Sequence, residues 1–303
     1  MRLIQHKKEA YWFYRFLSIF YDKYVNPLFW TEQMRDQSLE LGHLNDRELQ
    51  VIDVGSGTGF TTQGISKFIE AKNITCLDQS PHQMNKAKQK EELQNCTFIL
   101  GDAENIPFPA NKFDRYVSAG SIEYWPDPQQ GINESFRVIK PGGVALMIGP
   151  LEPGNKVGRF IANTWMLFPE DEQYRNWYKN AGFTNITVKY IRPQWFKGKK
   201  EYGIAIAGIK PVDAPSQINK SVQNEIEKLS IFRPFQIFWR VLIGSLAGFL
   251  FIPVAFIGYL KNSFRKKENI PDHYKERLNG YQLTMLFIIV ALIPLIIWLI
   301  VRK

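Results

Sequence analysis

The chain has 303 residues, of which 45% are hydrophobic and 22% charged, and a formal net charge of +9. This composition is typical of a globular protein and excludes a disordered chain, and two cysteines are too few for a disulfide-stabilised scaffold. The excess of basic residues falls in the C-terminal part beside apolar segments, which favours contact with lipid phosphates and predicts no nucleic-acid partner.

Aromatic side chains are concentrated near the start of the chain, in residues 11–30, YWFYRFLSIFYDKYVNPLFW. Trp and Tyr rings suit the boundary between acyl chains and water, and the same pattern is typical of a helix packed on a domain core. The two interpretations are compatible. We therefore assign residues 1–45 to an N-terminal segment that is helical or interfacial.

Strand and helix patterns alternate through residues 46–212. The predicted strands lie near 49–54, 73–78, 96–100, 113–119, 143–149, 184–191 and 202–210. The predicted helices lie at about 60–70, 81–92, 128–139 and 171–181. This order predicts an α/β domain with a doubly wound, mostly parallel sheet of seven strands and a hairpin at one edge.

The C-terminal part contains a polar linker, residues 213–240, followed by two uncharged apolar segments, 241–260 and 283–301. Each segment is close to the roughly 20 residues that cross a hydrocarbon core of about 30 Å. They predict a membrane anchor over residues 241–303. Two buried helices of a soluble bundle are the alternative, and the glycines and Pro253 of the first segment would also suit a re-entrant or tilted helix.

A glycine-rich turn follows the first predicted strand, in VIDVGSGTGF at residues 51–60. The strand ends with Asp53, and Gly55, Gly57 and Gly59 let the backbone approach a ligand where a Cβ would clash. The spacing is GxGxG and differs from the GxGxxG of dinucleotide-binding proteins. The turn predicts a nucleotide-like cofactor.

The next two strands also end in acidic residues. Asp78, followed by Gln79, lies where a carboxylate can accept both hydroxyls of a ribose. Asp102 and the backbone of Ala103 lie where an adenine edge would be recognised. The simpler interpretation is that these acids only stabilise turns and helix starts.

This set of strand ends resembles the class I S-adenosylmethionine-dependent methyltransferases, as do RVIKPGG before the fifth strand and NAGF after a later helix. The resemblance implies S-adenosylmethionine as the cofactor. It implies that the cofactor is bound by Asp53, Gly55, Gly57, Gly59, Asp78, Gln79, Asp102, Ala103 and Ser118.

Four longer runs carry a closer resemblance: YDKYVNPLFWTEQMRD, LDQSPHQMNKAKQK, DRYVSAGSIEYWPDP and WMLFPEDEQY. With the apolar C-terminal part, they are similar to the 2-methyl-6-phytylbenzoquinol and 2-methyl-6-solanesylbenzoquinol methyltransferases of cyanobacteria and chloroplast envelopes. This similarity implies C-methylation of the aromatic ring of a prenylated benzoquinol in tocopherol and plastoquinone biosynthesis. Two alternatives stay open: a methyltransferase for another membrane lipid, such as a different quinone or a sterol, and a non-catalytic membrane-bound cofactor-binding protein.

The segment GSIEYWPDP, residues 120–128, ends the fourth predicted strand beside the glycine turn, and we expect it to face the acceptor ring. Tyr124 and Trp125 can stack on a flat ring, with Ser121 beside them, and Glu123 can accept the hydroxyl proton. We predict Glu123 and Tyr124 as catalytic residues. Packing of the aromatic residues in the core and a loop role for Glu123 are the alternatives, and His43 and His82 are rival bases.

The remaining predictions concern metals, partners and location. No cluster of residues has the spacing of a metal site, and Cys76 and Cys96 are expected to be buried thiols. The expected partners are the prenylated benzoquinol and a bilayer. Without a recognisable signal or transit peptide, the sequence predicts an integral membrane protein with its catalytic domain on the cytoplasmic side, in a cyanobacterial thylakoid or plasma membrane, or in the inner envelope of a chloroplast.

Overall fold

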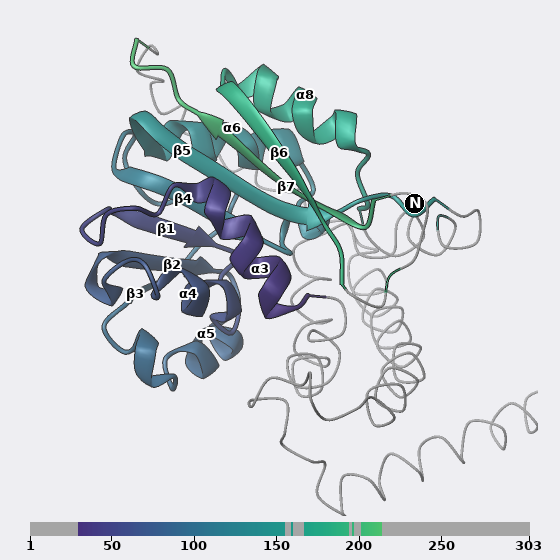
Figure 1. Ribbon diagram of the computed structural model, residues 1–303. Helices are drawn as coiled ribbons and strands as arrows, with labels where there is room; N and C mark the ends of the chain where they lie inside the picture. Colours follow the sequence, from purple (N-terminus) through teal and green to yellow (C-terminus); the bar gives the residue numbers. More distant parts are fainter. Residues whose placement is uncertain (1–29, 155–158, 160–166, 194–195, 197–200, 214–303) are drawn as a thin grey trace, which may run out of the picture. The chain divides into compact units, whose positions relative to one another are not determined.

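The computed structural model describes residues 30–154, 159, 167–193, 196 and 201–213. All of these residues belong to the first of two compact units, Met1–Ala247. A seven-stranded sheet forms the centre of the described part, in the order β3-β2-β1-β4-β5-β7-β6 (Figure 1). Strands β1 to β5 pair in parallel, and β7 is antiparallel to both of its neighbours. The predicted doubly wound, mostly parallel sheet with an edge hairpin is therefore confirmed.

The strands agree with the predicted ranges to within a few residues, except at the start of β5. They are β1 Val51–Val54, β2 Ile74–Asp78, β3 Thr97–Leu100, β4 Phe113–Ala119, β5 Ile139–Pro150, β6 Thr184–Ile191 and β7 Gly203–Ile209. Strand β5 begins earlier than predicted because the run IKPGG, which reads as a turn, already pairs with its neighbours. Phe113 is in register with Ile139, and the N–H of Gly142 donates to the carbonyl of Lys210 over 2.8 Å.

Four of the described helices lie between the strands as predicted, although two are shorter, and α3 precedes the first strand. The helices are α3 Glu32–Leu39, α4 Phe60–Ile65, α5 Pro81–Ala87, α6 Pro128–Val138 and α8 Asp171–Ala181. Short 3-10 helices are η2 Glu40–Gly42, η3 Ala71–Asn73, η4 Glu91–Leu93 and η5 Ile122–Tyr124. Residues 66–70 and 88–90, which we predicted to be helical, form turns after α4 and α5.

Side chains at the helix ends explain where α6 and α8 begin. Asp127 accepts a hydrogen bond from the N–H of Gln130 at 3.1 Å, and Pro128 takes the first helical position, where no N–H is needed. Glu170 and Gln173 form a capping box at the start of α8. Gly182, with φ 95°, ends α8 in the left-handed conformation. Asp127 is thus a helix cap, in line with the expectation of a structural residue.

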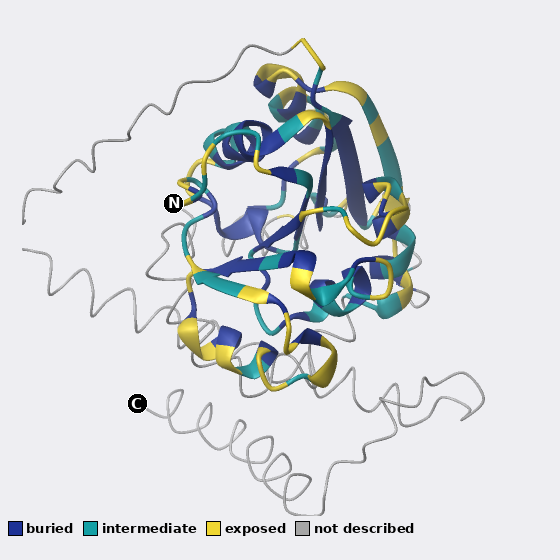
Figure 2. Cartoon of the chain, turned by 90° about the vertical axis from the view of Figure 1, so that its left-hand side faces the viewer, coloured by how far each residue is buried: buried dark blue, intermediate teal, exposed yellow. Residues whose placement is uncertain are grey.

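Two apolar layers cover the faces of the sheet. On one face, Ile132 and Phe136 of α6 pack with Tyr174 and Tyr178 of α8. On the other face, the buried residues include Met34 and Leu39 of α3, Ile65 of α4 and Ala87 of α5. The inner strands of the sheet are mostly buried, whereas the edge strands β3 and β6 and the outer sides of the helices carry exposed residues (Figure 2). The described part is therefore a three-layer α/β domain in which α3 belongs to one of the helical layers.

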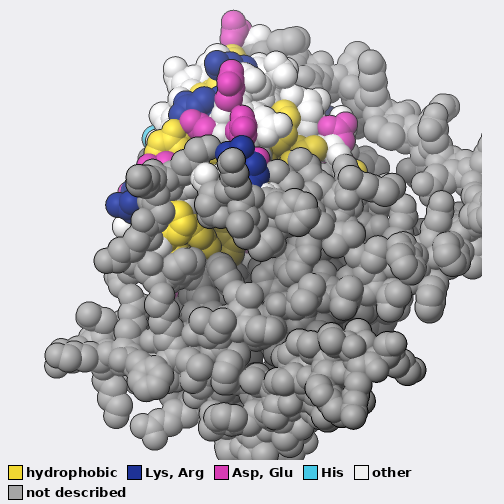
Figure 3. All heavy atoms as spheres, turned by 90° about the vertical axis from the view of Figure 1, so that its right-hand side faces the viewer, with side chains coloured by type: hydrophobic (Ala, Val, Ile, Leu, Met, Phe, Trp, Pro, Cys, Tyr) yellow, Lys and Arg dark blue, Asp and Glu magenta, His cyan; other side chains and the backbone are white. Residues whose placement is uncertain are grey.

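The described residues contain no helix that is long and apolar enough to cross a membrane. The apolar segments 241–260 and 283–301 and the linker 214–240 lie outside the described residues, as do residues 1–29. Where described side chains are visible in Figure 3, basic and acidic groups are interspersed. That face therefore has no extended basic surface among its described residues.

A buried ion pair ties the loop after β3 to helix α6. Arg137 and Glu134, whose side chains are about nine-tenths buried, meet at 2.6 Å. Arg137 also donates to the carbonyls of Ile106 and Phe108 at 2.9 and 2.7 Å, and Glu134 accepts from the N–H of Ile106 at 2.8 Å. Each charge is therefore fully engaged, and the loop has one fixed position on the helix.

Substitution of Arg137 by Met should destabilise the fold by about 3–5 kcal/mol, because the carboxylate of Glu134 would stay buried without its counter-ion. Lys140→Met is the matched control, since it breaks the Lys140–Asp114 pair, whose lysine is 44% exposed. An exposed pair is worth at most about 1 kcal/mol. Chemical denaturation of both variants measures the difference, and similar losses would contradict a special role for the buried pair.

Candidate active site

The strand order reverses at β1, whose neighbours are β2 on one side and β4 on the other. At such a point the connections that follow adjacent strands run to opposite sides of the sheet. A crevice therefore opens beyond the carboxyl ends of these strands. A pocket is found there. Its lining includes Trp30 and Arg35 before the sheet, residues 55–58 of the glycine turn, Asp78 and Gln79 after β2, Gly101 and Ala103 after β3, and Gly120, Ser121, Tyr124 and Trp125 after β4.

The glycine turn lies directly after β1, as predicted. Gly55, Gly57 and Gly59 all have positive φ, at 72°, 54° and 84°, a conformation that residues with a side chain rarely adopt. The N–H of Gly55 donates to the carbonyl of Leu77 at 2.8 Å, which fastens the turn to β2. Gly55 and Gly57 line the pocket, whereas Gly59 begins helix α4 and lies outside the lining.

Asp78 is 8% exposed and lines the pocket at the end of β2. Its Oδ2 accepts from the N–H of Gly57 at 2.9 Å and its Oδ1 from the N–H of Ser80 at 2.8 Å. Burial raises the pKa of Asp78, and these backbone hydrogen bonds act against the rise. Because each carboxylate oxygen has two lone pairs, both oxygens can still accept a hydroxyl of a ligand.

Asp53 is fully buried at the carboxyl end of β1 and does not line the pocket. Its Oδ2 accepts a hydrogen bond from the hydroxyl of Thr62 at 2.6 Å, and its Oδ1 has no partner among the described residues. Burial raises the pKa of Asp53 to about 7. An acceptor of this kind beside the glycine turn suits a ligand that carries a hydrogen-bond donor or a positive charge.

Two of the residues predicted to bind the cofactor hold the framework of the site. The Oδ1 of Asp102 accepts from the N–H of Glu104 at 2.9 Å, and Asp102 forms a bridge with Asn105, so its described contacts are those of a turn. Its neighbour Ala103 does line the pocket. Ser118 is fully buried, and its hydroxyl contacts the carbonyl of Val54 at 2.7 Å and the hydroxyl of Ser121 at 2.6 Å.

The segment after β4 brings two aromatic residues to the pocket. Tyr124 and Trp125 are 6% and 7% exposed and both belong to the lining. The ring of Trp125 also lies against the backbone of α6, in the space that a Cβ at Gly131 would occupy. For Trp125, core packing and pocket lining are therefore both present.

Glu123 lies beneath the crevice and outside its lining. Its side chain is 5% exposed, and burial raises its pKa to about 8. The Oε2 atom has no partner among the described residues, and Oε1 lies 3.8 Å from the position that a Cβ of Gly120 would take. Gly120 itself lines the pocket, so the carboxyl group of Glu123 lies close behind the pocket wall.

The lining also contains residues that the sequence did not single out as site residues, above all Trp30 and Arg35. The Nε1 of Trp30 lies 3.8 Å from the same Cβ position of Gly120. Both residues come from the N-terminal side of α3, far from the sheet in sequence. The run WTEQMRD, which contains them, was noted only for its family resemblance. His43 and His82, the rival bases, do not line this pocket.

Comparisons with known proteins agree with this geometry. A family model described as a methyltransferase domain matches residues 52–147. The 2-methyl-6-phytyl-1,4-hydroquinone methyltransferase of Arabidopsis thaliana, a chloroplastic enzyme, is 49% identical over 271 residues, which cover 88% of this chain and 80% of the relative. The chloroplastic enzyme of the same name from Spinacia oleracea is 48% identical over 272 residues, covering 88% and 78%.

Solved structures share the fold at low identity. Phosphoethanolamine N-methyltransferase 2 of Haemonchus contortus, in complex with S-adenosyl-L-methionine, has a TM-score of 0.54 at 17% identity. The match covers 66% of this chain and 60% of that one. The described domain therefore has the Rossmann-like fold of class I methyltransferases, as the sequence predicted.

The predicted localisation is wrong. The sequence predicts an integral membrane protein with its catalytic domain on the cytoplasmic side, whereas the four relatives of 47–49% identity are chloroplastic enzymes.

The raised pKa of Glu123 predicts a pH-dependent stability. The unfolded chain loses this proton near pH 4.3 and the folded chain only near 8, so stability falls by about 1.4 kcal/mol per pH unit between these values. Glu123→Gln removes this loss. Its unfolding free energy relative to the wild type should therefore increase from pH 5 to pH 8 in chemical denaturation.

Glu172→Gln, a change at an exposed glutamate in the first turn of α8, is the control, and its difference from the wild type should stay constant over this range. A Glu123→Gln difference that also stays constant would show that the carboxyl group is already ionised at pH 5.

Proposed function

We propose that this chain, which belongs to the family of 2-methyl-6-phytyl-1,4-hydroquinone methyltransferases, methylates a ring carbon of a prenylated hydroquinone in tocopherol biosynthesis with S-adenosylmethionine as the methyl donor. The identity of 47–49% over 88% of the chain supports the substrate class. The observation that carries the proposal is the shared pocket: Tyr124 and Trp125 line the same crevice as the glycine turn and Asp78. A flat aromatic acceptor and a nucleoside cofactor therefore find their binding groups side by side.

The residues present suit this cofactor. Asp78 offers two buried carboxylate oxygens for the ribose hydroxyls, and Ala103 lines the pocket at the next strand end, where the adenine would lie. The bare backbone of Gly55 and Gly57 suits the amino acid end, and the unpartnered Oδ1 of Asp53 is buried behind this turn. When bound, the cofactor supplies an electrophilic methyl group on a sulfonium. Gly59, Asp102 and Ser118 contribute to cofactor binding by shaping the site. Gly59 shapes the glycine turn, Asp102 the loop after β3, and Ser118 the end of β4.

The acceptor ring would lie between the aromatic side chains and the turn after β4. Tyr124 and Trp125 contribute flat apolar faces, and Ser121 contributes a hydroxyl at the edge of the pocket. Glu123, which lies behind Gly120, would accept the proton that leaves the hydroxyl of the ring. Ionisation of that hydroxyl makes the neighbouring ring carbon more nucleophilic, and a positioned base promotes it.

A bilayer as a partner stays a prediction. It rests on the prenyl chain of the substrate and on the apolar segments 241–260 and 283–301, which lie outside the described residues. The choice between a phytyl and a solanesyl chain also stays open, because the described pocket residues address the ring and the cofactor.

The function predicts that the purified full-length chain converts 2-methyl-6-phytyl-1,4-hydroquinone and S-adenosylmethionine to a ring-methylated product and S-adenosylhomocysteine. Mass spectrometry of both products measures the reaction, and the solanesyl analogue run in parallel measures the preference for the chain. Tyr124→Ala should lower kcat/KM for the hydroquinone at unchanged cofactor affinity. Formation of S-adenosylhomocysteine with a sterol but with neither hydroquinone would contradict the proposal.

The base assignment predicts a steep dependence on pH. Since the pKa of Glu123 in the free chain is about 8, kcat/KM of the wild type should rise with pH up to that value as the carboxyl group ionises. Glu123→Gln keeps the shape and loses the base, so kcat should fall by about 10²–10⁴. Part of the loss should return as the pH approaches the phenol pKa of roughly 10, where solvent ionises the ring.

The alternative is catalysis by alignment alone, which can be worth about 7–11 kcal/mol. A Glu123→Gln enzyme with near-normal kcat at neutral pH would favour that alternative, and Tyr124→Ala and Trp125→Ala would then be the damaging substitutions.

A further inference from the structure

Arg35 is a buried cation at the edge of the pocket. It belongs to helix α3, which precedes the sheet in the sequence. Arg35 is 4% exposed and lines the crevice. Among the described residues of the lining, Arg35 is the only one with a positive charge and Asp78 the only one with a negative charge. Arg35 lies outside the sequence motifs predicted to bind the cofactor, and the residues proposed above for the cofactor leave it without a role.

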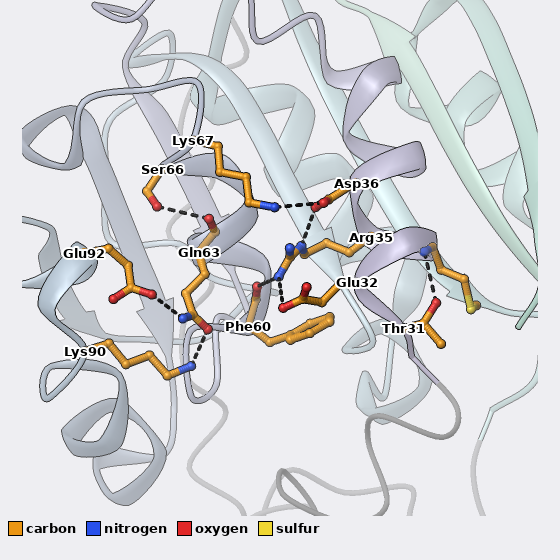
Figure 4. A network of polar contacts seen from close by, with 11 residues as sticks. Thr31, Glu32, Arg35, Asp36, Phe60, Gln63, Ser66, Lys67, Lys90 and Glu92 are labelled. Carbon is orange, nitrogen blue, oxygen red and sulfur yellow. Dashed lines mark hydrogen bonds and ion pairs between the residues drawn. The ribbon is translucent and has the colours of Figure 1, made fainter. Parts of the chain in front are cut away.

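The guanidinium group is held over the start of α4, directly after the glycine turn. Its Nη1 donates to the carbonyl of Phe60 at 3.0 Å, and its Nε donates to Oδ1 of Asp36 at 2.8 Å (Figure 4). Its central carbon lies 4.7 Å from the centre of the Phe60 ring. Phe60 also lines the pocket, so the arginine is fixed against a wall of the site.

Helix α4 provides the space for this side chain. A Cβ at Gly64 would lie 2.6 Å from Nε of Arg35 and 2.7 Å from a methyl carbon of Leu39. A glycine costs about 1 kcal/mol relative to alanine inside a helix. The glycine in FTTQGI therefore permits the close packing of α3 on α4 that brings Arg35 to the crevice.

The charges around Arg35 leave it available to an anion. Its partner Asp36, which is 39% exposed, also accepts from Lys67 at 2.8 Å, so two cations share one carboxylate (Figure 4). The nearest oxygen of Glu32 is 3.9 Å from Nη1, beyond hydrogen-bonding distance. A guanidinium has five N–H donors, and the two hydrogen bonds above are those it makes within the described part of the chain.

We propose that Arg35 binds the α-carboxylate of the amino acid end of the cofactor. The inference rests on the proposed function, since it names the group that holds one end of S-adenosylmethionine. Asp78 and Arg35 would then bind two different ends of the ligand. Asp78 accepts hydrogen bonds from the ribose hydroxyls, and Arg35 donates hydrogen bonds to the carboxylate. A planar guanidinium suits a carboxylate because it can donate two parallel hydrogen bonds.

Calorimetric titration with two ligands tests the proposal without turnover. S-adenosylhomocysteine carries the carboxylate, and S-adenosyl-3-thiopropylamine is the same molecule without it. The full-length wild type should bind S-adenosylhomocysteine roughly 10- to 100-fold more tightly than the amine, since hydrogen bonds to a charged group contribute about 1.5–3 kcal/mol. Arg35→Gln should lose this advantage and bind both ligands with about the affinity that the wild type has for the amine.

Three further variants separate binding from folding. Lys67→Gln removes a cation from the same network at a residue outside the pocket lining and should leave both affinities unchanged. Asp78→Ala should weaken both ligands equally, because both carry the ribose. Arg35→Lys keeps the charge and loses the two parallel N–H donors of the guanidinium, so its preference for the carboxylate should be intermediate. This variant replaces Arg35→Gln in the test if Arg35→Gln does not fold.

The outcomes are distinct. If the wild type binds neither ligand, the cofactor of the proposed function is wrong. If the wild type binds both ligands and Arg35→Gln weakens them equally, or weakens neither, Arg35 only braces α3 against α4 and the inference is overturned.

Discussion

The reversal of strand order at β1 is the constraint on which the rest of the site depends. Because β2 and β4 pair with β1 from opposite sides and all three run parallel, their carboxyl ends meet at one edge of the sheet. Gly55, Asp78 and Tyr124 are far apart in sequence and line one crevice for this reason alone. No local interaction among them is needed to bring them together.

The two sides of the crevice are held by different forces. The loop after β3, which contains Ala103, is fixed by the buried Glu134–Arg137 pair and its hydrogen bonds to Ile106 and Phe108. Helix α3 is held by the apolar side chains of Met34 and Leu39, and its ion pairs, one within the helix and one with Lys67 after α4, are partly exposed. Partly exposed pairs contribute little to stability. The charged residues of α3 are therefore better explained by a role in ligand binding at the pocket than by a contribution to the stability of the fold.

The sequence was sufficient for the sheet, because β1 to β4 are largely apolar runs that each end at, or directly before, a glycine or an acid. It was sufficient for the glycine turn and Asp78, whose places follow from strand order. It was insufficient for Arg35 and Trp30, because their burial depends on how α3 packs on a helix that follows much later in the chain. The one local signal was Gly64, a residue that weakens α4 without a reason inside α4 itself. Ser118 and Asp102 also lie at strand ends, where the hydroxyl of Ser118 donates to the carbonyl of Val54 and Asp102 accepts from the N–H of Glu104.

Asp78 lines the crevice, and Asp53 and Glu123 are buried behind residues that line it. Burial raises the pKa of each acid: Asp53 to about 7, Glu123 to about 8, and Asp78 above its ordinary value. A carboxyl group in such surroundings favours its neutral form until a positive charge lies nearby. A ligand with positive charge near its middle would lower these pKa values by direct attraction, and the binding of that ligand would in turn be strengthened by the ionised acids. A carboxylate on the same ligand would be repelled by the acids and must therefore lie away from them. Arg35, on the α3 side of the crevice, is where such a group finds an opposite charge.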